Sequence, residues 1–201
     1  IYTSANQVAA ILPSSVPVGS GTLTVSYQGT SGTVPIRVTS RSIGIFAVNQ
    51  QGSGPGVITD GISFKLRTPT DAAHPGDILT IWSTGLGPIT ADETNAPPPG
   101  DLNSGVEVFV GGKSARVLYG GRGSSAGLDQ INFAVPEGLS GCYVSLVARV
   151  NGVSSNFITF PVTPAGVSVC DDPVGLSAAD LQKIQDTGKL KVAGIGLTSL
   201  T

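Results

Sequence analysis

The chain has 201 residues, of which 28 are Gly, 14 are Pro and only 12% are charged, with a net charge of −2 at pH 7 and a pI near 5.2. This balance excludes the Lys- and Arg-rich surface on which nucleic-acid binding depends. Frequent turn residues and few charges indicate an all-β protein, and the lack of any run of eighteen apolar residues predicts no membrane span.

An internal repeat begins close to the first residue. Residues Asn6–Pro13 read NQVAAILP, and 123 positions later Asp129–Pro136 read DQINFAVP. With the same spacing, TLTVSYQGTSGTVPIRV (Thr22–Val38) resembles YVSLVARVNGVSSNFITFPV (Tyr143–Val162). A repeat unit of this length predicts two related modules rather than a solenoid of short repeats.

Alternating apolar residues predict β-strands with one buried face. The Asn151-Gly152 pair lies between two such runs, and because both residues tolerate positive φ it predicts a tight hairpin. Short strands joined by Gly- and Pro-rich turns are typical of a sandwich. The alternating runs contain Leu23, Val25 and Tyr27; Leu79 and Ile81; Val106, Val108 and Val110; and Val144, Leu146, Ala148 and Val150.

We divide the chain into a first module at residues 1–40, a second at 41–164 and a tail at 165–201. In the tail, SAADLQKIQDTGK predicts one short helix, with Ser177 as its N-cap, Asp180 three residues later and Gly188 as its end. The following KLKVAGIGLTSL predicts a terminal strand with a bulge or bend. Its apolar positions are Leu190, Val192, Ile195 and Leu197.

Two cysteines follow the second copy of the repeat. Cys142 opens a predicted strand and Cys170 follows the last strand of the same module, so both fall at one end of a sandwich. A disulfide there would contribute roughly 3–4 kcal/mol by the chain-entropy estimate. The alternative is a pair of free thiols. Without a CxxC pair and with a single histidine, a Cys/His metal site is not expected.

Four ordered segments resemble a known family: DAAHPGDILTIWSTGLGPIT, VEVFVGGKSARVLYGG, LDQINFAVPEGLSG and VNGVSSNFITFPV. Together they resemble the Solibacter-type C-terminal domain of acidobacterial secreted proteins. The resemblance implies immunoglobulin-like (IPT/TIG-like) sandwiches in exported proteins, with no established catalytic residues. The tail after Cys170 and the shortened first module depart from the family pattern.

The first module is expected to be an incomplete sandwich. In the second module about eighty residues precede DQINFAVP, and the first module has no counterpart of them. Half a sandwich would expose its apolar face and one strand edge. Three sources of cover remain open: an upstream part of a longer precursor, the tail strand from the same or a neighbouring chain, or dimerisation through the edge.

The sequence offers little for catalysis or for a cofactor. A Ser-His-Asp site would need His74, the sole histidine, which precedes Pro-Gly as turn residues do, and no GxSxG elbow is present. The adjacent acids Asp92–Glu93 and Asp171–Asp172 are typical of solvated turns. No phosphate loop is expected at TGLGP, because no helix follows it.

Two aromatic residues are candidates for stacking on a ligand. Trp82 could stack on a sugar ring, but both faces of its strand carry apolar residues, so the pattern does not say which face is core. Tyr119 is a second candidate for such a platform.

We therefore expect a secreted or cell-surface protein without enzymatic activity. Its function would be structural or adhesive, as a homo-oligomer or as a filament polymerising through β-strand pairing. The alternative is a carbohydrate-binding accessory module of an exported enzyme, with a glycan as its ligand.

Overall fold

The computed structural model describes residues 2–90, 100–102 and 105–191. An all-β fold is confirmed: the described part contains fifteen strands and a single helix. Four strands form two N-terminal hairpins: β1 Tyr2–Thr3 with β2 Val8–Ala9, and β3 Gly19–Tyr27 with β4 Thr30–Val38. The remaining elements are β5 Gly44–Ile45, β6 Gly54–Pro55, β7 Ile58–Asp60, β8 Ile78–Thr84, β9 Gly100–Asp101, β10 Val106–Val110, β11 Lys113–Arg122, β12 Asp129–Ala134, β13 Gly141–Val150, β14 Val153–Ser154, β15 Ile158–Val162 and α1 Ala178–Thr187.

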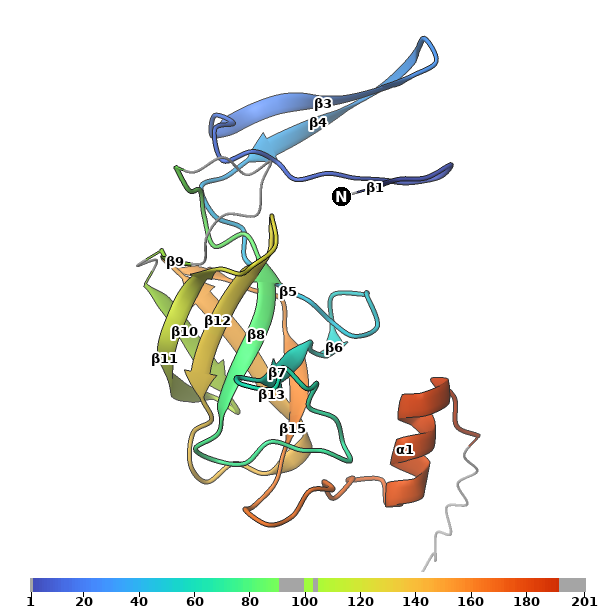
Figure 1. Cartoon of the computed structure of the whole chain (residues 1–201), viewed down its shortest axis with the longest axis vertical. Helices are drawn as coiled ribbons and strands as arrows, with labels where there is room; N and C mark the ends of the chain where they lie inside the picture. Colours follow the sequence, from blue (N-terminus) through green and yellow to red (C-terminus); the bar gives the residue numbers. More distant parts are fainter. Residues whose placement is uncertain (1, 91–99, 103–104, 192–201) are drawn as a thin grey trace, which may run out of the picture.

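One curled sheet forms the main body. Its strands follow the order β5-β8-β12-β11-β10-β13-β15-β6, and the short strands β7, β9 and β14 pair with β8, β11 and β13. Figure 1 shows how the long strands curl around one another. The long strand β11 takes part in both halves, pairing with β10 near Lys113–Ala115 and with β12 beyond Arg116. The register is irregular between Val117 and Tyr119, and such an irregularity increases local bend and twist.

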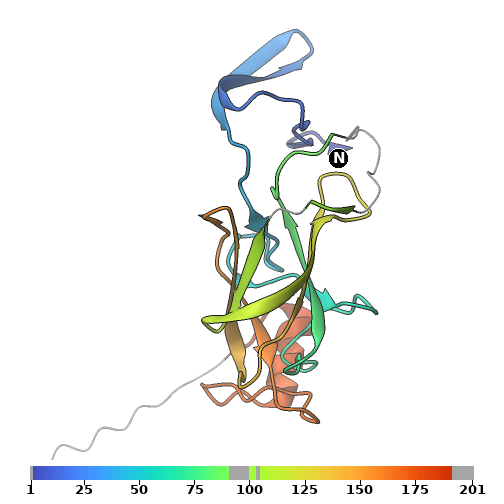
Figure 2. The same cartoon turned by 90° about the vertical axis from the view of Figure 1, so that its left-hand side faces the viewer.

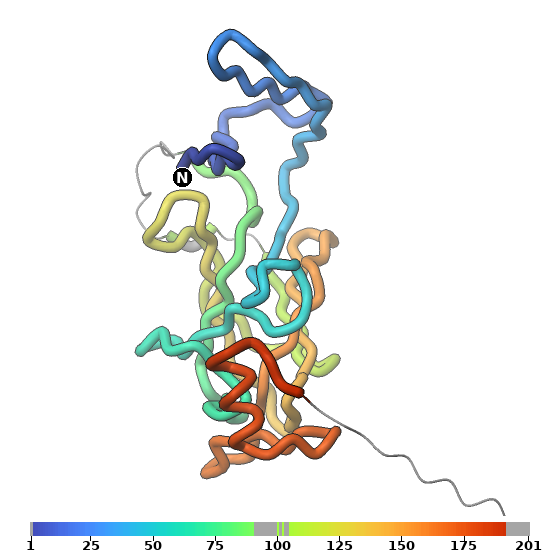
Figure 3. The backbone as a smooth tube through the Cα atoms, turned by 90° about the vertical axis from the view of Figure 1, so that its right-hand side faces the viewer, coloured from blue at the N-terminus to red at the C-terminus, as the bar shows by residue number. Residues whose placement is uncertain are grey.

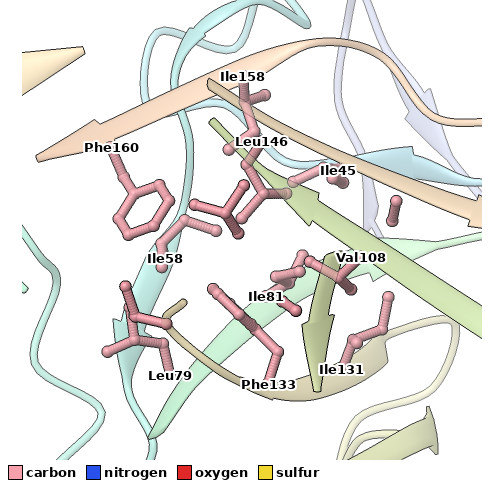
Figure 4. Close-up of a cluster of buried hydrophobic side chains, with 14 of the residues drawn as sticks. Ile45, Ile58, Leu79, Ile81, Val108, Ile131, Phe133, Leu146, Ile158 and Phe160 are labelled. Atoms are coloured by element: carbon pink, nitrogen blue, oxygen red, sulfur yellow. The ribbon is translucent and has the colours of Figure 1, made fainter. Parts of the chain in front are cut away.

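The core lies between the two halves of this sheet (Figure 4). Alternate residues of β12 and β13 face inward, as the sequence pattern predicts. Phe133 of β12 meets Phe160 of β15 edge to face, with ring centroids 6.2 Å apart. The largest buried side chains are Phe133, Phe160, Ile58, Leu79, Ile81, Leu86, Ile131, Leu146 and Ile158.

The predicted turn at Asn151-Gly152 is confirmed, and the first copy of the repeat has the same geometry. Asn151 and Gly152 have φ of 48° and 83°, and Gln28 and Gly29 have 48° and 78°. Positive φ at both central residues is the signature of a type I′ hairpin, whose twist matches that of the flanking strands. The two turns lie in corresponding places of the repeat.

The predicted helix is confirmed with its caps. The Ser177 side chain accepts a bond from the Asp180 backbone N–H, the Asp180 carboxylate accepts from Ser177, and Gly188 ends the helix at φ 66°. Leu181 packs on the Cys142–Cys170 disulfide, which closes a 28-residue separation. The sequence leaves open whether the two cysteines are bonded. In the structure they are, and the disulfide fastens the tail to β13.

The hairpin β3–β4 and the helix α1 lie at opposite ends of the long axis of the molecule (Figures 1 and 2). The tube in Figure 3 shows the same arrangement from another side: the N-terminal hairpin extends beyond the curled sheet, while α1 lies beside the far end. Among the strands of the described residues, neither N-terminal hairpin pairs with the main sheet.

Truncating the core should destabilise the main body. We expect Phe133→Ala to cost about 3–5 kcal/mol, because it removes a buried ring and leaves a cavity against Phe160. Urea unfolding measures the change. Leu118→Ala, on the same sheet but 40% exposed, is the control and should cost much less; equal losses would contradict the core assignment.

Removing the disulfide should also lower stability. The double variant Cys142→Ser/Cys170→Ser should lose about 3–4 kcal/mol of unfolding free energy, because its unfolded chain regains the entropy of an open loop. Urea midpoints with and without reductant measure this. Reductant should destabilise the wild type and leave the double variant unchanged.

Candidate interaction surface

The hairpin β3–β4 has one apolar and one polar face. Residues directly opposite each other in an antiparallel pair share a face, and Leu23 is opposite Val34 while Gly21 is opposite Ile36. On the polar face Ser26 and Ser31 lie opposite each other, with their hydroxyls 2.7 Å apart. We define the hairpin apolar face as Leu23, Val25, Tyr27, Val34, Ile36 and Val38.

This face is largely open to solvent. Leu23 and Val25 are each 48% exposed, Val34 is 50% exposed and Tyr27 is 74% exposed. Covering each of these side chains would contribute about 1 kcal/mol, since full burial of such a residue is worth roughly twice that. A contiguous apolar patch of this kind is typical of an interaction site.

The second copy of the repeat buries the same positions. Leu146, Ala148 and Val150 of β13, which lie 123 residues after Leu23, Val25 and Tyr27, are fully buried. The two hairpins therefore share a side-chain pattern but differ in whether that pattern is covered.

The strand pairing corrects the repeat spacing beyond the turn. Leu23 pairs with Val34, whereas Leu146 pairs with Ile158, so β4 and β15 correspond at a spacing of 124 rather than 123. The second copy carries one extra residue between its turn and β15. With this correction the inward Ile158 and Phe160 of β15 correspond to Val34 and Ile36 of the hairpin apolar face.

Three strands cover β13 and β15 in the main body. Strand β10 pairs along the edge of β13, and β8 and β12 face it across the core. Within the described residues, β3 pairs with β4 alone. An isolated two-stranded hairpin is marginally stable in water, so β3–β4 lacks the support that its counterpart has.

A groove of about 680 Å³ lies below the hairpin, between the residue 9–18 and 37–42 segments and the end of the main sheet. Its buried lining residue Arg122 forms an ion pair with Asp129 and donates to the Gly87 carbonyl at 2.7 Å. Asp129 also accepts the Leu86 N–H at 2.8 Å. These contacts fasten the 85–87 loop to the start of β12, which is a structural role.

The two aromatic candidates share the outer face of the main sheet. Trp82 lies opposite Gln130 and Tyr119 opposite Asn132, with the two β12 residues two positions apart. Tyr119 donates its hydroxyl to the Arg122 carbonyl at 2.6 Å. The platform suggested by the sequence is thus a shared face with two amide side chains between its rings.

A loop packs against Trp82, which is one of the placements that the pattern of its strand leaves open. Its indole N–H donates to Thr59 Oγ1 at 3.0 Å, and its ring is 5.8 Å from the ring of Phe64. Phe64 is 53% exposed and has φ of 56°. Trp82 is therefore half-buried under the loop that follows β7, and its donor is already used.

The remaining candidates stabilise loops or fall outside the described residues. His74 Nδ1 lies 3.1 Å from the Thr163 carbonyl, and Asp172 accepts the Tyr143 hydroxyl at 2.7 Å. This bond raises the pKa of Tyr143 to about 12. Asp171 is exposed at the surface. Asp92, Glu93, Val192, Ile195 and Leu197 lie outside the described residues, and Leu190 lies in coil after α1.

A search of the described residues finds no group of three His, Cys, Asp or Glu side chains that could hold a metal ion. Within that same part of the chain, no helix has the length and apolar character to cross a membrane. No protein-family model matches the sequence, and no curated protein matches it. The resemblance to the Solibacter-type domain therefore stays a prediction.

Hydrogen exchange should separate the two hairpins. In dilute solution we expect the β3–β4 amides to exchange much faster than those of β13, because only β13 is covered on its face and on both edges. Mass spectrometry of peptic fragments measures the rates. Equal protection of the two hairpins would show that β3–β4 is stable without cover.

The loop beside Trp82 should loosen in acid. The pKa of Asp60 is lowered to about 2, chiefly because its carboxylate accepts the Ser63 backbone N–H, and also through the Ser63 hydroxyl, the Ile62 N–H and Arg67. Since the folded pKa lies below the unfolded value of 3.8, this stabilisation is full above about pH 4 and is lost as pH falls towards about 2.

Urea unfolding followed by Trp82 fluorescence across this window measures the effect. Asp60→Asn should flatten the loss of stability between about pH 4 and pH 2. Asp171→Asn removes a charge at an exposed loop position and should retain the wild-type slope. An unchanged slope in Asp60→Asn would contradict the assignment to Asp60.

Proposed function

We propose that the chain is a non-catalytic assembly module of a secreted or cell-surface protein, and that copies join by β-strand complementation at the hairpin apolar face. The observation that carries the proposal is the contrast between two equivalent hairpins: Leu23 and Val25 are half exposed, whereas Leu146 and Ala148 are fully buried.

We infer an architecture of two immunoglobulin-like modules, the first of them incomplete. The order of two antiparallel pairs, β1–β2 and β3–β4, repeats that of β11–β12 and β13–β15. Within the described residues, no strands ahead of β1 correspond to β5 to β10. The resemblance to Solibacter-type domains supports this interpretation, since it implies such sandwiches in exported proteins.

We assign the donor to the tail of a neighbouring copy, at Leu190, Val192, Ile195 and Leu197. The end of α1 and the hairpin lie at opposite ends of the molecule (Figure 1), which favours donation between copies over donation within one. A contact that joins unlike surfaces of successive copies is heterologous and generates a filament when its rotation does not close.

Export and lack of catalysis have separate support. The Cys142–Cys170 disulfide suits an oxidising compartment, since such bonds are rare in the cytosol. Among the candidate catalytic groups, His74 is held by the Thr163 carbonyl and Asp172 by Tyr143. These side chains are already used by the fold.

A carbohydrate-binding function is the second candidate. It is favoured by one observation: Trp82 and Tyr119 share a sheet face with Gln130 and Asn132 between them, and amide side chains beside aromatic rings suit sugar hydroxyls and ring faces. A glycan array on the wild type and Trp82→Ala tests it; binding lost in the variant would support this function, and absence of binding would reject it.

Sedimentation of the full chain across a micromolar to millimolar range tests the assembly proposal. We expect concentration-dependent association in the wild type. Association should be lost in Val25→Lys, which places a charge on the hairpin apolar face, and in a chain truncated after Lys189. Thr24→Lys places the same charge on the polar face of the same strand and should associate as the wild type does.

A wild type that stays monomeric throughout this range would reject assembly between copies. Association that survives both Val25→Lys and the truncation would place the contact elsewhere and would also reject the proposal. Electron microscopy of the associated wild type separates filaments from closed oligomers.

A further inference from the structure

The two edges of the hairpin differ in their capacity to accept another strand. Strand β3, Gly19–Tyr27, contains neither a proline nor a charged residue, so every one of its residues retains a backbone N–H and no charge opposes pairing. Strand β4 contains Pro35 and Arg37. Proline cannot donate to a sheet ladder, and charge on an edge strand discourages pairing. Strand β3 is therefore the better acceptor.

The main body shows which strand fits such an edge. Strand β10 pairs antiparallel with β13, placing Val106 opposite Val150, Val108 opposite Ala148 and Val110 opposite Leu146. Val108 and Val110 are fully buried, whereas Glu107 points outward and pairs with Arg149 at 2.8 Å. The covering strand thus has small aliphatic residues at every second position and polar or aromatic residues between them.

Transferring this pairing to the first module gives a register. Because β3 and β13 correspond at a spacing of 123, the counterparts of Val150, Ala148 and Leu146 are Tyr27, Val25 and Leu23. A strand in the position of β10 would place three aliphatic side chains beside the hairpin apolar face. Its alternate residues would lie beside Thr22, Thr24 and Ser26, whose polarity tolerates solvent.

We propose that β3 is the acceptor edge of the assembly surface, and that its partner is an extended strand running antiparallel to it, with aliphatic side chains opposite Leu23, Val25 and Tyr27. This inference rests on the proposed function, because it specifies the strand that completes the hairpin. It selects β3 rather than β4 as the acceptor strand, and an antiparallel rather than a parallel direction for the partner strand. It also selects the register in which the aliphatic side chains of the partner lie on the hairpin apolar face.

The register also constrains the proposed tail donor. In the antiparallel alignment, placing Leu190 opposite Tyr27 and Val192 opposite Val25 brings Gly194 opposite Leu23. The tail therefore matches two of the three aliphatic positions, whereas the sequence of β10 matches all three. A peptide of the β10 sequence is the stronger probe of the edge, and a tail peptide tests the donor separately.

The experiment adds synthetic peptides to the full chain truncated after Lys189, which keeps α1 and the disulfide and removes the proposed donor. One peptide has the sequence of residues 105–113, GVEVFVGGK; a second has that of residues 189–200, KLKVAGIGLTSL; the control replaces Val108 of the first by Asp. Hydrogen exchange with single-residue readout locates the binding, and titration gives the dissociation constant.

We expect GVEVFVGGK to protect alternate amides of β3, those that do not bond to β4, and to leave the outer edge of β4 unchanged. Val25→Lys should weaken binding by about tenfold or more, because the new charge would be buried against an aliphatic side chain. Thr24→Lys should bind as the parent does, and the Asp control peptide should not bind.

Protection along β4, a parallel alignment or failure of GVEVFVGGK to bind would overturn the inference. These results need no variant, so they are independent of whether Val25→Lys folds. Binding of GVEVFVGGK at β3 without binding of the tail peptide would keep the acceptor edge and register while removing the tail as donor. Dimerisation of the truncated chain through β3 would assign the edge to a second copy of itself and overturn the inference.

Discussion

The organisation of this protein depends on the requirement that a strand with one apolar face must be covered. Alternation of period two makes β13 and β3 alike: each places aliphatic side chains on one side of the sheet. In β13 these side chains complete a core, with Leu146 and Val150 fully buried, whereas Leu23 and Tyr27 of β3 are largely exposed. The two strands thus have the same apolar pattern, and within the described residues only β13 has its apolar face covered. The contrast is informative because both hairpins belong to the same chain and therefore fold under the same conditions.

Much of the fold was predictable because its signals are local. The Asn151-Gly152 turn follows from backbone tolerance of positive φ, and the helix boundaries follow from Ser177 and Gly188. The cysteine pair was identified as a candidate, but whether it was bonded depended on the spatial proximity of two strand ends. The one-residue shift between β4 and β15 could not be predicted by aligning the copies, since both spacings align similar residues; the strand pairing decides it.

The candidate site was less predictable than the fold. Strand β8 has apolar residues on both faces, so its pattern could not place Trp82, and the residues that pack against it come from a loop with no periodicity. The hairpin apolar face was predicted in outline, from the expectation that the first module is incomplete. The difference between the edges of β3 and β4 was not predictable, because Pro35 matters for pairing only where β4 has an unpaired edge, which the strand order shows. Charged and titratable groups such as Arg122 and His74, which attract notice in a sequence, turn out to hold loops and strand ends in place.

The disulfide has a mechanical consequence for a molecule extended along one axis. Cys142 lies at the start of β13, which is hydrogen-bonded to β10 on one side and to β15 on the other. A pulling force on the C-terminal tail is therefore transmitted through the disulfide to β13, and the segment from β15 to Cys170 does not carry it. Strand β15 is then not pulled away from β13 one hydrogen bond at a time. Force must instead shear a ladder of many bonds at once, a geometry suited to bearing tension.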